Sequence, residues 1–345
     1  MIGAFITGLV GPALERDERA FLREAAPWGL ILFKRNIGSP EQVTRLVADF
    51  REAVGRADAP VLIDQEGGRV QRLRPPHWPE YPAGAAYGRL YDRDRRAGLA
   101  AARLGARLIA GDLLALGITV DCLPVADVPI DGADAVIGDR AYGVTPDKVA
   151  ALAAAAAEGL MRGGVLPVLK HLPGHGRATA DSHERLPVVD TGRDVLARTD
   201  FAAFQPLADI PLGMTAHVVY TAIDPIEPAT TSRTIIADVI RGLIGFQGAL
   251  MSDDITMGAL SGTIGERTHA ALAAGCDLIL HCNGRLDEMQ AVARDAGALE
   301  GRAASRAQAA LDARRQPDEI DLIAARREFA AMMQERPLTA RMARS

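Results

Sequence analysis

The sequence contains few cysteines, few aromatic residues and no long apolar run. Only three of the 345 residues are cysteines, and aromatic residues make up 4% of the chain. Cys122, Cys276 and Cys282 lie inside apolar runs without paired spacing, which predicts buried free thiols in a reducing compartment and excludes a disulfide scaffold. No uninterrupted apolar run in the sequence approaches the roughly 20 residues that a membrane-spanning helix needs. We therefore expect a cytoplasmic protein without a membrane partner.

The sequence also lacks a concentration of charge of one sign. The formal net charge is −5 and is spread over both halves of the chain. Because there is no basic stripe to neutralise phosphates, we expect no nucleic-acid partner. Residues 1–14 are apolar but carry no positive charge before the apolar part, and they pass directly into the charged segment 15–24. We interpret them as a first strand rather than a signal peptide.

What the sequence does contain is typical of a folded α/β enzyme. Apolar residues make up 48% and charged residues 24% of the chain, which suits a sizeable core. Short runs rich in β-forming residues alternate with helical stretches and show no strict polar alternation, as expected for a parallel sheet covered by helices. The eight strand candidates are residues 4–10, 29–33, 60–64, 119–125, 165–170, 212–219, 249–252 and 277–281.

Helix signals lie between these strands. Ser39-Pro40 followed by Gln42 predicts a capped start for a helix over residues 43–54, and Thr145-Pro146 predicts the same for residues 148–162, which end at Gly163-Gly164. Eight such units favour a single closed (β/α)8 barrel of the TIM type, with an open doubly wound sheet as the competing architecture.

No linker divides the chain, so we expect residues 1–345 to form one barrel domain with a helical C-terminal tail from about residue 318. Residues 74–89 are rich in proline, glycine and aromatic residues. We expect them to form a long loop over the mouth of the barrel.

Polar residues follow several of the predicted strands. They are Asp64-Gln65-Glu66, Lys170-His171, His217, Asp253-Asp254 and His281. A single Asp in such a position is most often a helix cap, and a single His is most often a structural group. The set is harder to explain as caps, and the C-terminal ends of barrel strands meet at one mouth, so it predicts a functional site. His77 and His269 lack this context and are expected to be structural.

The segment 170–187, KHLPGHGRATADSHERLP, carries the richest group of polar residues. Its proline and glycines prevent a helix, so it is expected to leave the strand as an irregular loop. Asp181 stands two residues before His183, close enough to accept a hydrogen bond from one ring nitrogen and to favour the imidazolium. Such an imidazolium can donate a proton near neutral pH. The alternative interpretation is a loop cap with an exposed histidine, which is the more frequent role of an isolated DSH tripeptide.

Two features admit other chemistry. His171 and His175 have the four-residue spacing of helical zinc ligands, but Pro173-Gly174 between them removes the helix that would make this spacing meaningful. The adjacent pair Asp253-Asp254 also suits substrate-assisted hydrolysis, in which the acetamide of the sugar attacks and the protein supplies no nucleophile.

These motifs together identify a family resemblance. KHLPGHG from Lys170, Asp181-Ser182-His183, Met251-Ser252-Asp253-Asp254 and DQEGGRVQR from Asp64 resemble glycoside hydrolase family 3. The resemblance extends from the first strand to about Asn283. It is strongest to the single-domain bacterial β-N-acetylglucosaminidases (β-N-acetylhexosaminidases) of peptidoglycan recycling.

The resemblance implies a role for individual residues. Asp253 matches the family nucleophile, His183 matches the general acid/base, and Asp181 matches its orienting partner. The positions that hold the hydroxyls of the terminal sugar are matched by Asp64, Arg72, Arg140, Lys170 and His171. The chain departs from the family pattern at Asp139, where Glu is frequent, and at Leu172, where Phe is usual, and these departures bear on the fit of the substrate.

Four functional hypotheses follow. The first is a metal-independent retaining exo-β-N-acetylglucosaminidase that removes GlcNAc from GlcNAc-β-1,4-anhydroMurNAc peptides as a cytoplasmic monomer without a cofactor. The second is a substrate-assisted hexosaminidase. The third is a carbohydrate-binding protein without catalytic activity. The fourth is a metal-dependent barrel hydrolase that uses His171, His175, His217 and His281.

Overall fold

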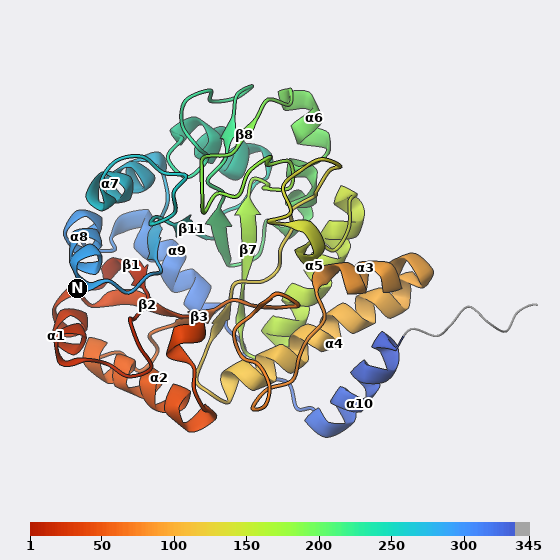
Figure 1. Ribbon diagram of the computed structural model, residues 1–345, viewed down its shortest axis with the longest axis horizontal. Helices are drawn as coiled ribbons and strands as arrows, with labels where there is room; N and C mark the ends of the chain where they lie inside the picture. Colours follow the sequence, from red (N-terminus) through yellow and green to blue (C-terminus); the bar gives the residue numbers. More distant parts are fainter. Residues whose placement is uncertain (335–345) are drawn as a thin grey trace, which may run out of the picture.

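Residues 1–334, which the computed structural model describes, contain a closed barrel of eight parallel strands (Figure 1). Around the barrel the strands follow the order β1, β12, β11, β9, β7, β6, β3, β2, and each pairs in parallel with its neighbours. The closed sheet confirms the predicted TIM-type barrel and excludes an open doubly wound sheet. The strands are β1 (Gly3–Thr7), β2 (Pro27–Leu32), β3 (Val61–Ile63), β6 (Val120–Asp121), β7 (Leu166–Leu172), β9 (Leu212–Thr215), β11 (Ala249–Asp254) and β12 (Leu278–His281).

Helices surround the barrel as an outer layer (Figure 1). Those that connect or follow the strands are α1 (Arg16–Ala25), α2 (Pro40–Val54), α3 (Gly84–Arg93), α4 (Arg95–Leu114), α5 (Pro146–Arg162), α6 (Arg193–Arg198), a π-helix (Ile235–Leu243), α7 (Ile264–Ala274), α8 (Leu286–Ala296), α9 (Gly301–Asp312) and α10 (Leu322–Met333). Within residues 1–334 no helix combines the length and the apolar character needed to cross a membrane.

Two strand predictions were too long by four residues or more. The predicted strand 212–219 ends at Thr215, and Val219 instead belongs to β10 (Val219–Tyr220), which pairs with β8 (Val188–Val189) outside the barrel. The predicted strand 119–125 shrinks to the two residues of β6. In both places a continuous apolar run extends past the barrel into a buried connection, and apolar periodicity does not distinguish the two. A further hairpin, β4 (Gln65–Gly67) with β5 (Val70–Gln71), follows β3.

The helix-start predictions were only partly correct. Ser39 Oγ accepts a hydrogen bond from the Gln42 N–H at 3.3 Å, as a cap does. The Gln42 side chain, however, accepts from the Gly38 N–H at 2.7 Å, one residue before the position that a reciprocal capping box requires. Among the described residues the Thr145 side chain makes no capping bond, although Pro146 does begin α5. That helix ends before Gly163-Gly164, and Gly164 takes the left-handed φ of 77°.

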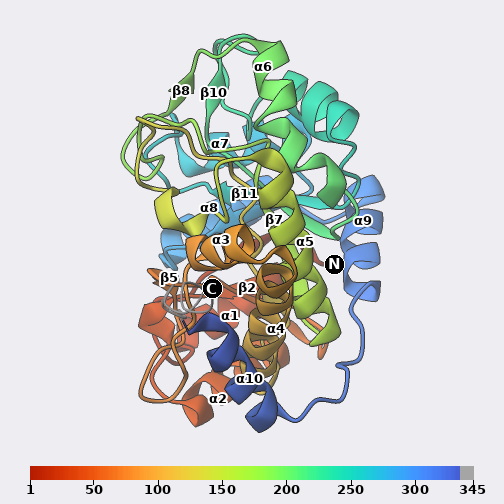
Figure 2. The same cartoon turned by 90° about the vertical axis from the view of Figure 1, so that its right-hand side faces the viewer.

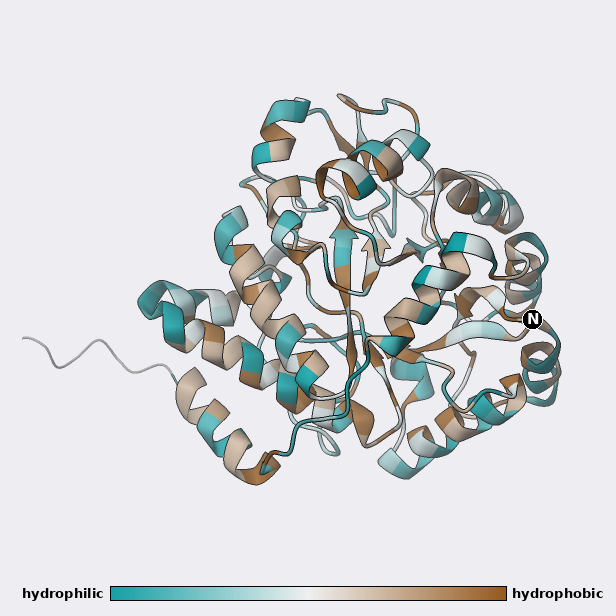
Figure 3. Cartoon of the chain, turned by 180° about the vertical axis from the view of Figure 1, so that it is seen from behind, coloured by the Kyte–Doolittle hydropathy of each residue, from teal (hydrophilic) through white to brown (hydrophobic). Residues whose placement is uncertain are grey.

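The interior of the barrel is filled with apolar side chains, and one end is closed by α9. Ala307 and Ala310 of α9 pack in the same cluster as the inward residues of the strands. Figure 2 shows α9 on the side of the barrel opposite β5 and β8, and Figure 3 shows apolar strands inside helices with polar outer faces. The inward residues are Ile6, Ile31, Leu62, Val120, Cys122, Leu166, Val168, Leu212, Met214, Ala249, Met251, Leu278 and Leu280.

The prediction that the proline-rich segment 74–89 forms a long loop over the mouth was wrong. Its last part is helical, because α3 begins at Gly84. Tyr81 is buried, and its hydroxyl donates a 2.6 Å hydrogen bond to Asp112 of α4. Arg326 of α10 donates to the same hydroxyl at 3.0 Å. The segment is therefore held against the outer helices, and α10 occupies the predicted helical tail as far as Met333. The remainder of the predicted tail, residues 335–345, lies outside the described residues.

The three cysteines are free thiols, as predicted. Cys122 and Cys276 are buried, whereas Cys282 is only partly buried and lies at the edge of the cavity described below.

Candidate active site

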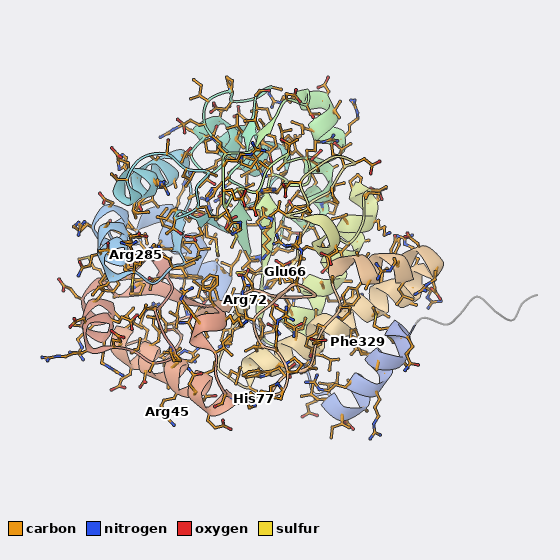
Figure 4. All side chains as sticks on the ribbon, in the orientation of Figure 1. Arg45, Glu66, Arg72, His77, Arg285 and Phe329 are labelled. Carbon is orange, nitrogen blue, oxygen red and sulfur yellow. The ribbon has the colours of Figure 1, made fainter. Side chains whose placement is uncertain are left out.

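The C-terminal ends of the strands surround a cavity of about 380 Å³, within the size range of small-molecule sites. All the residues that the sequence singled out for catalysis or sugar binding line this one cavity. They are Asp64, Arg72, Arg140, Lys170, His171, Asp181, His183 and Asp253. In Figure 4, Glu66 and Arg72 lie near the centre of the molecule, whereas His77 lies at the periphery beside Arg45. His77 and His269 are both exposed on the outside.

A network of alternating charges forms one wall of the cavity. The Asp64 carboxylate accepts from Arg72 Nη2 at 2.9 Å and from Lys170 Nζ at 3.0 Å. Lys170 Nζ also lies 2.6 Å from Glu66 Oε1. Arg140 donates to both oxygens of Glu66, at 2.9 and 2.8 Å. Two carboxylates thus hold three cations in fixed positions, and bidentate pairing adds geometric precision.

The network keeps both carboxylates ionised. Burial raises the pKa of Glu66, but Arg140 and Lys170 outweigh it and lower the pKa to about 2. Burial also raises the pKa of Asp64, yet Lys170 and Arg72 hold it well below its usual range. Burial lowers the pKa of Lys170, and Glu66 and Asp64 reverse that effect, so its pKa lies above the usual value. The wall therefore presents fixed charges and strong hydrogen-bond donors to a polar ligand.

Arg140 reaches this network because α3 lies unusually close to the loop that carries it. A Cβ atom on Gly84 would lie 2.2 Å from the Arg140 carbonyl oxygen, and one on Gly88 would lie 1.9 Å from the Tyr142 carbonyl oxygen. Only glycine permits this approach at either position. The neighbouring Asp139, where the family often has Glu, pairs with Arg69 at 3.2 Å on the surface and leaves Glu66 to Arg140.

Asp253, the second-last residue of β11, has one carboxylate oxygen to which no described residue donates. Its Oδ1 accepts from the Asp254 N–H at 2.8 Å, and none of the described residues donates to Oδ2. Burial raises the pKa of Asp253, but the nearby imidazoles of His217 and His171 outweigh it and hold the pKa below the usual value. The side chain is thus an ionised carboxylate with an oxygen directed to ligands rather than to the protein.

Asp254 differs from its neighbour because both of its oxygens are used by the protein. Oδ1 accepts from the Thr256 N–H at 3.0 Å and from the Cys282 N–H at 3.2 Å, and Oδ2 accepts from the Thr256 hydroxyl at 2.7 Å. These bonds join the end of β11 to the end of β12. Asp254 therefore supports the backbone around Asp253 rather than offering a second free carboxylate.

Asp181 and His183 lie on the loop that follows β7. His183 Nδ1 is 2.8 Å from Asp181 Oδ1, and the same oxygen accepts from the His183 N–H at 2.9 Å. The His183 side chain is 68% exposed, and none of the described residues hydrogen-bonds to its Nε2. Burial raises the pKa of Asp181, but hydrogen bonds from the His183 backbone and ring outweigh it and lower the pKa. The carboxylate thus orients the ring and leaves Nε2 for a ligand.

The four histidines of the metal hypothesis each have a protein partner. The pairs are His171 with Asp127 at 2.7 Å, His175 with Ser182 at 3.1 Å, His217 with Thr230 at 2.7 Å and His281 with Glu288 at 3.4 Å. Within the described part of the chain, no group of three or more His, Cys, Asp or Glu side chains is arranged to hold a metal ion. The spacing of His171 and His175 therefore has another explanation, which is given below.

Sequence reasoning missed two partners of the predicted residues. Glu66 was noticed at a strand end but was not included among the binding residues, although it is the carboxylate between Lys170 and Arg140. Asp127 was not considered, although it orients His171. It stands two residues after the fourth predicted strand, so the strand-end rule applied to that strand would have selected it.

Comparison with known families accounts for this arrangement. The model of the glycosyl hydrolase family 3 N-terminal domain matches residues 5–314. The chain belongs to glycoside hydrolase family 3. The match covers the barrel from the middle of β1 to β12 and every residue that lines the cavity.

Curated relatives and solved structures agree with this family. A β-hexosaminidase of Alkalilimnicola ehrlichii is 41% identical over 287 residues, which cover 82% of this chain and 81% of the relative. A β-hexosaminidase of Methylococcus capsulatus is 41% identical over 301 residues and 86% of each chain. Native NagZ from Neisseria gonorrhoeae has a TM-score of 0.82 with 33% identity over 96% of each chain. NagZ of that organism also has a structure in complex with N-trifluoroacetyl-D-glucosamine, with a TM-score of 0.81 and 32% identity over 96% of this chain and 98% of that one.

Proposed function

We propose that the protein is a retaining exo-β-N-acetylglucosaminidase in which Asp253 is the nucleophile and His183 is the general acid/base. The observation that carries this proposal is the pairing, around one cavity, of an ionised carboxylate with an unoccupied oxygen and an Asp-oriented imidazole with a free Nε2. Retaining hydrolysis needs one group of each kind.

The class of the enzyme rests on its family and relatives. The chain is a glycoside hydrolase of the β-N-acetylhexosaminidase type. The complex of the Neisseria gonorrhoeae relative with an N-acylated glucosamine supports a GlcNAc substrate for this chain as well.

The first chemical step makes a covalent glycosyl-enzyme. Asp253 Oδ2 attacks the anomeric carbon while the protonated His183 gives its Nε2 proton to the glycosidic oxygen, and the aglycone leaves as an alcohol. In the second step the now neutral His183 takes a proton from water, which attacks the anomeric carbon and releases Asp253. Because an imidazole replaces a second carboxylate as the proton carrier, no extra negative charge opposes the ionisation of Asp253.

The charged wall holds the terminal sugar. Arg72, Lys170 and Arg140 present donors, and Asp64 presents acceptors, at positions fixed by their mutual ion pairs. Such charge-assisted groups suit the neighbouring hydroxyls of a single sugar ring. His171, held by Asp127, donates or accepts at the same wall. This arrangement supports action on one terminal sugar at a time.

The physiological substrate proposed is a GlcNAc-β-1,4-anhydroMurNAc peptide released during turnover of the bacterial cell wall. In this role the protein acts in the cytoplasm as a monomer, with residues 1–345 as one catalytic domain and without a metal or a cofactor. Hydrolysis of a purified anhydromuropeptide to free GlcNAc, monitored by mass spectrometry, tests the substrate. A preparation that retains activity after exhaustive chelation excludes the metal-dependent alternative.

The decisive experiment traps the intermediate. A 5-fluoro glycoside of GlcNAc should inactivate the enzyme and add one sugar mass to the peptide that contains Asp253. The Asp253→Ala variant provides the control and should acquire no label. Labelling of another residue would contradict the proposal.

The substrate-assisted alternative predicts a different outcome of the same test. It requires no covalent adduct and predicts strong inhibition by a thiazoline that mimics the cyclised sugar. The hydrogen bonds of Asp254 argue against it, because that carboxylate is occupied by Thr256 and Cys282 and is not free to polarise an acetamide.

A further inference from the structure

We propose that Ser182, His175 and Gly258 form a latch that holds the loop of His183 beside the strand of Asp253. The latch consists of three hydrogen bonds from residues 182 and 183 to two other parts of the barrel mouth. The inference rests on the proposed acid/base role of His183. It assigns to these three residues a positioning role rather than a direct part in the reaction.

Ser182 is the buried residue between two more exposed ones. It is 2% exposed, whereas the side chains of Asp181 and His183 are 34% and 68% exposed. Its Oγ lies 3.1 Å from His175 Nε2. The loop therefore turns its middle residue inward as an anchor and its two flanking side chains toward the cavity. This alternation explains why a serine separates Asp181 from His183.

His175 connects that anchor to the floor of the cavity. Its backbone N–H donates to Asp127 Oδ1 at 2.6 Å, and Asp127 Oδ2 holds His171. Burial, with a further contribution from His171, lowers the pKa of His175 to about 4, so the ring is neutral near pH 7. A neutral imidazole forms the bond to Ser182 in either tautomer. The four-residue spacing of His171 and His175 thus brings the ring of His171 and the backbone N–H of His175 to the same carboxylate.

The second part of the latch joins the loop to the chain just after Asp253. The Gly258 N–H donates to the His183 carbonyl at 3.2 Å, and the Ala259 N–H donates to the Ser182 carbonyl at 3.1 Å. These bonds tie the proton carrier directly to the segment that follows the nucleophile. Movement of the His183 loop away from the segment after Asp253 must break these two hydrogen bonds.

Gly258 is required for this close approach. A Cβ atom there would lie 2.9 Å from the carbonyl oxygens of both His183 and Glu184, closer than real Cβ contacts. The φ of Gly258 is not in the left-handed region, so its backbone conformation accepts alanine. An alanine at this position therefore pushes the loop away without straining its own backbone.

The test compares substrates that depend differently on the proton donor. Ser182→Ala and Gly258→Ala are assayed on aryl GlcNAc glycosides with a phenol leaving group and with a 2,4-dinitrophenol leaving group. We expect kcat/KM to fall at least tenfold more for the phenyl substrate, because only that leaving group needs protonation in the first step. Ser305→Ala on the exposed face of α9 and Gly192→Ala at an open turn are the matched controls, and both should match the parent enzyme.

A double-mutant cycle tests the bond from Ser182 to His175. If the bond positions His183, the Ser182→Ala/His175→Ala double variant should lose no more discrimination between the two substrates than the more affected single variant. Additive losses, or equal losses on both substrates in the Ser182→Ala and Gly258→Ala variants, would overturn the latch.

His183→Ala separates this inference from the proposed function. If His183→Ala affects both substrates equally in the first step, the acid role itself is wrong. If His183→Ala shows the selective loss and the latch variants do not, the acid role stands and the latch is rejected.

Discussion

Nζ of Lys170 lies 2.6 Å from Oε1 of Glu66, and the two side chains are only 2% and 4% exposed. The lysine also binds Asp64, so its removal leaves buried carboxylates without a cation. We expect Lys170→Met to lower the free energy of unfolding by about 3–5 kcal/mol, as the loss of one partner of a buried ion pair does. Urea denaturation measures this change.

A lysine with an exposed partner provides the comparison. Lys148 pairs with Asp92 at the same distance of 2.6 Å, but Asp92 is 62% exposed. Lys148→Met should therefore change the free energy of unfolding by less than about 1 kcal/mol. Equal losses in the two variants would show that burial of the Lys170 network contributes nothing to stability.

The lowered pKa of Glu66 predicts how the free energy of unfolding depends on pH. Its pKa is about 2 in the folded protein, whereas the ordinary value of 4.5 applies to the unfolded chain. A carboxylate whose pKa is depressed by folding stabilises the fold above its unfolded pKa and loses that effect as the pH falls through the folded value. Stability should thus decline between about pH 4.5 and pH 2. Urea midpoints should fall less steeply over this window in Glu66→Gln, although that variant starts from a lower stability. Glu158→Gln, in an exposed pair, should follow the parent curve.

Replacement of Asp253 should reduce activity, whereas replacement of the neighbouring Asp254 should reduce stability. Asp253→Ala should lower kcat/KM at least about a thousandfold, because it removes the proposed nucleophile, while the melting temperature stays near that of the parent. Asp254→Ala should instead lower the free energy of unfolding by about 1–3 kcal/mol, because it leaves donors of Thr256 and Cys282 without an acceptor. Thermal melts and initial rates on one preparation of each variant separate the two effects. A fully active Asp253→Ala would contradict the proposed mechanism.

Asp181 should determine the activity on poor leaving groups. Its carboxylate holds the His183 ring at 2.8 Å, and Asp181→Asn replaces this acceptor with an amide that holds the ring less firmly. Activity on the phenyl glycoside near neutral pH should fall by a factor of about 10 to 100. Asp190→Asn, an exposed change farther along the same segment, serves as the control. Unchanged activity of Asp181→Asn on the phenyl glycoside would show that this carboxylate does not position His183.

The sequence predicted the barrel because its strands are buried on both faces. The apolar runs of β7 and β11 are continuous, and each ends in charged residues, which is the pattern of a parallel barrel with a site at its mouth. The same rule placed Lys170 and Asp253 in one cavity. These features are local in the chain and are therefore visible in its pattern.

Contacts between distant segments were not visible in that pattern. The partner of His171 is Asp127, which lies 44 positions earlier in the chain, and the partner of Tyr81 is Asp112 on α4, 31 positions later. Gln42 bonds to Gly38 rather than to Ser39, because the backbone before the helix turns differently from a capping box. The hydrogen-bond partner of each of these residues depends on which surfaces the fold brings together. The spacing of residues along the chain does not determine it.

Closure of one end of the barrel by Ala307 and Ala310 of α9 also affects the route that ligands take during turnover. Because α9 closes this end, substrate, water and products enter and leave the proposed reaction through the cavity at the opposite end. In that reaction the aglycone departs after the first step, so water reaches the glycosyl-enzyme beside the loop of His183 before the sugar leaves by the same opening.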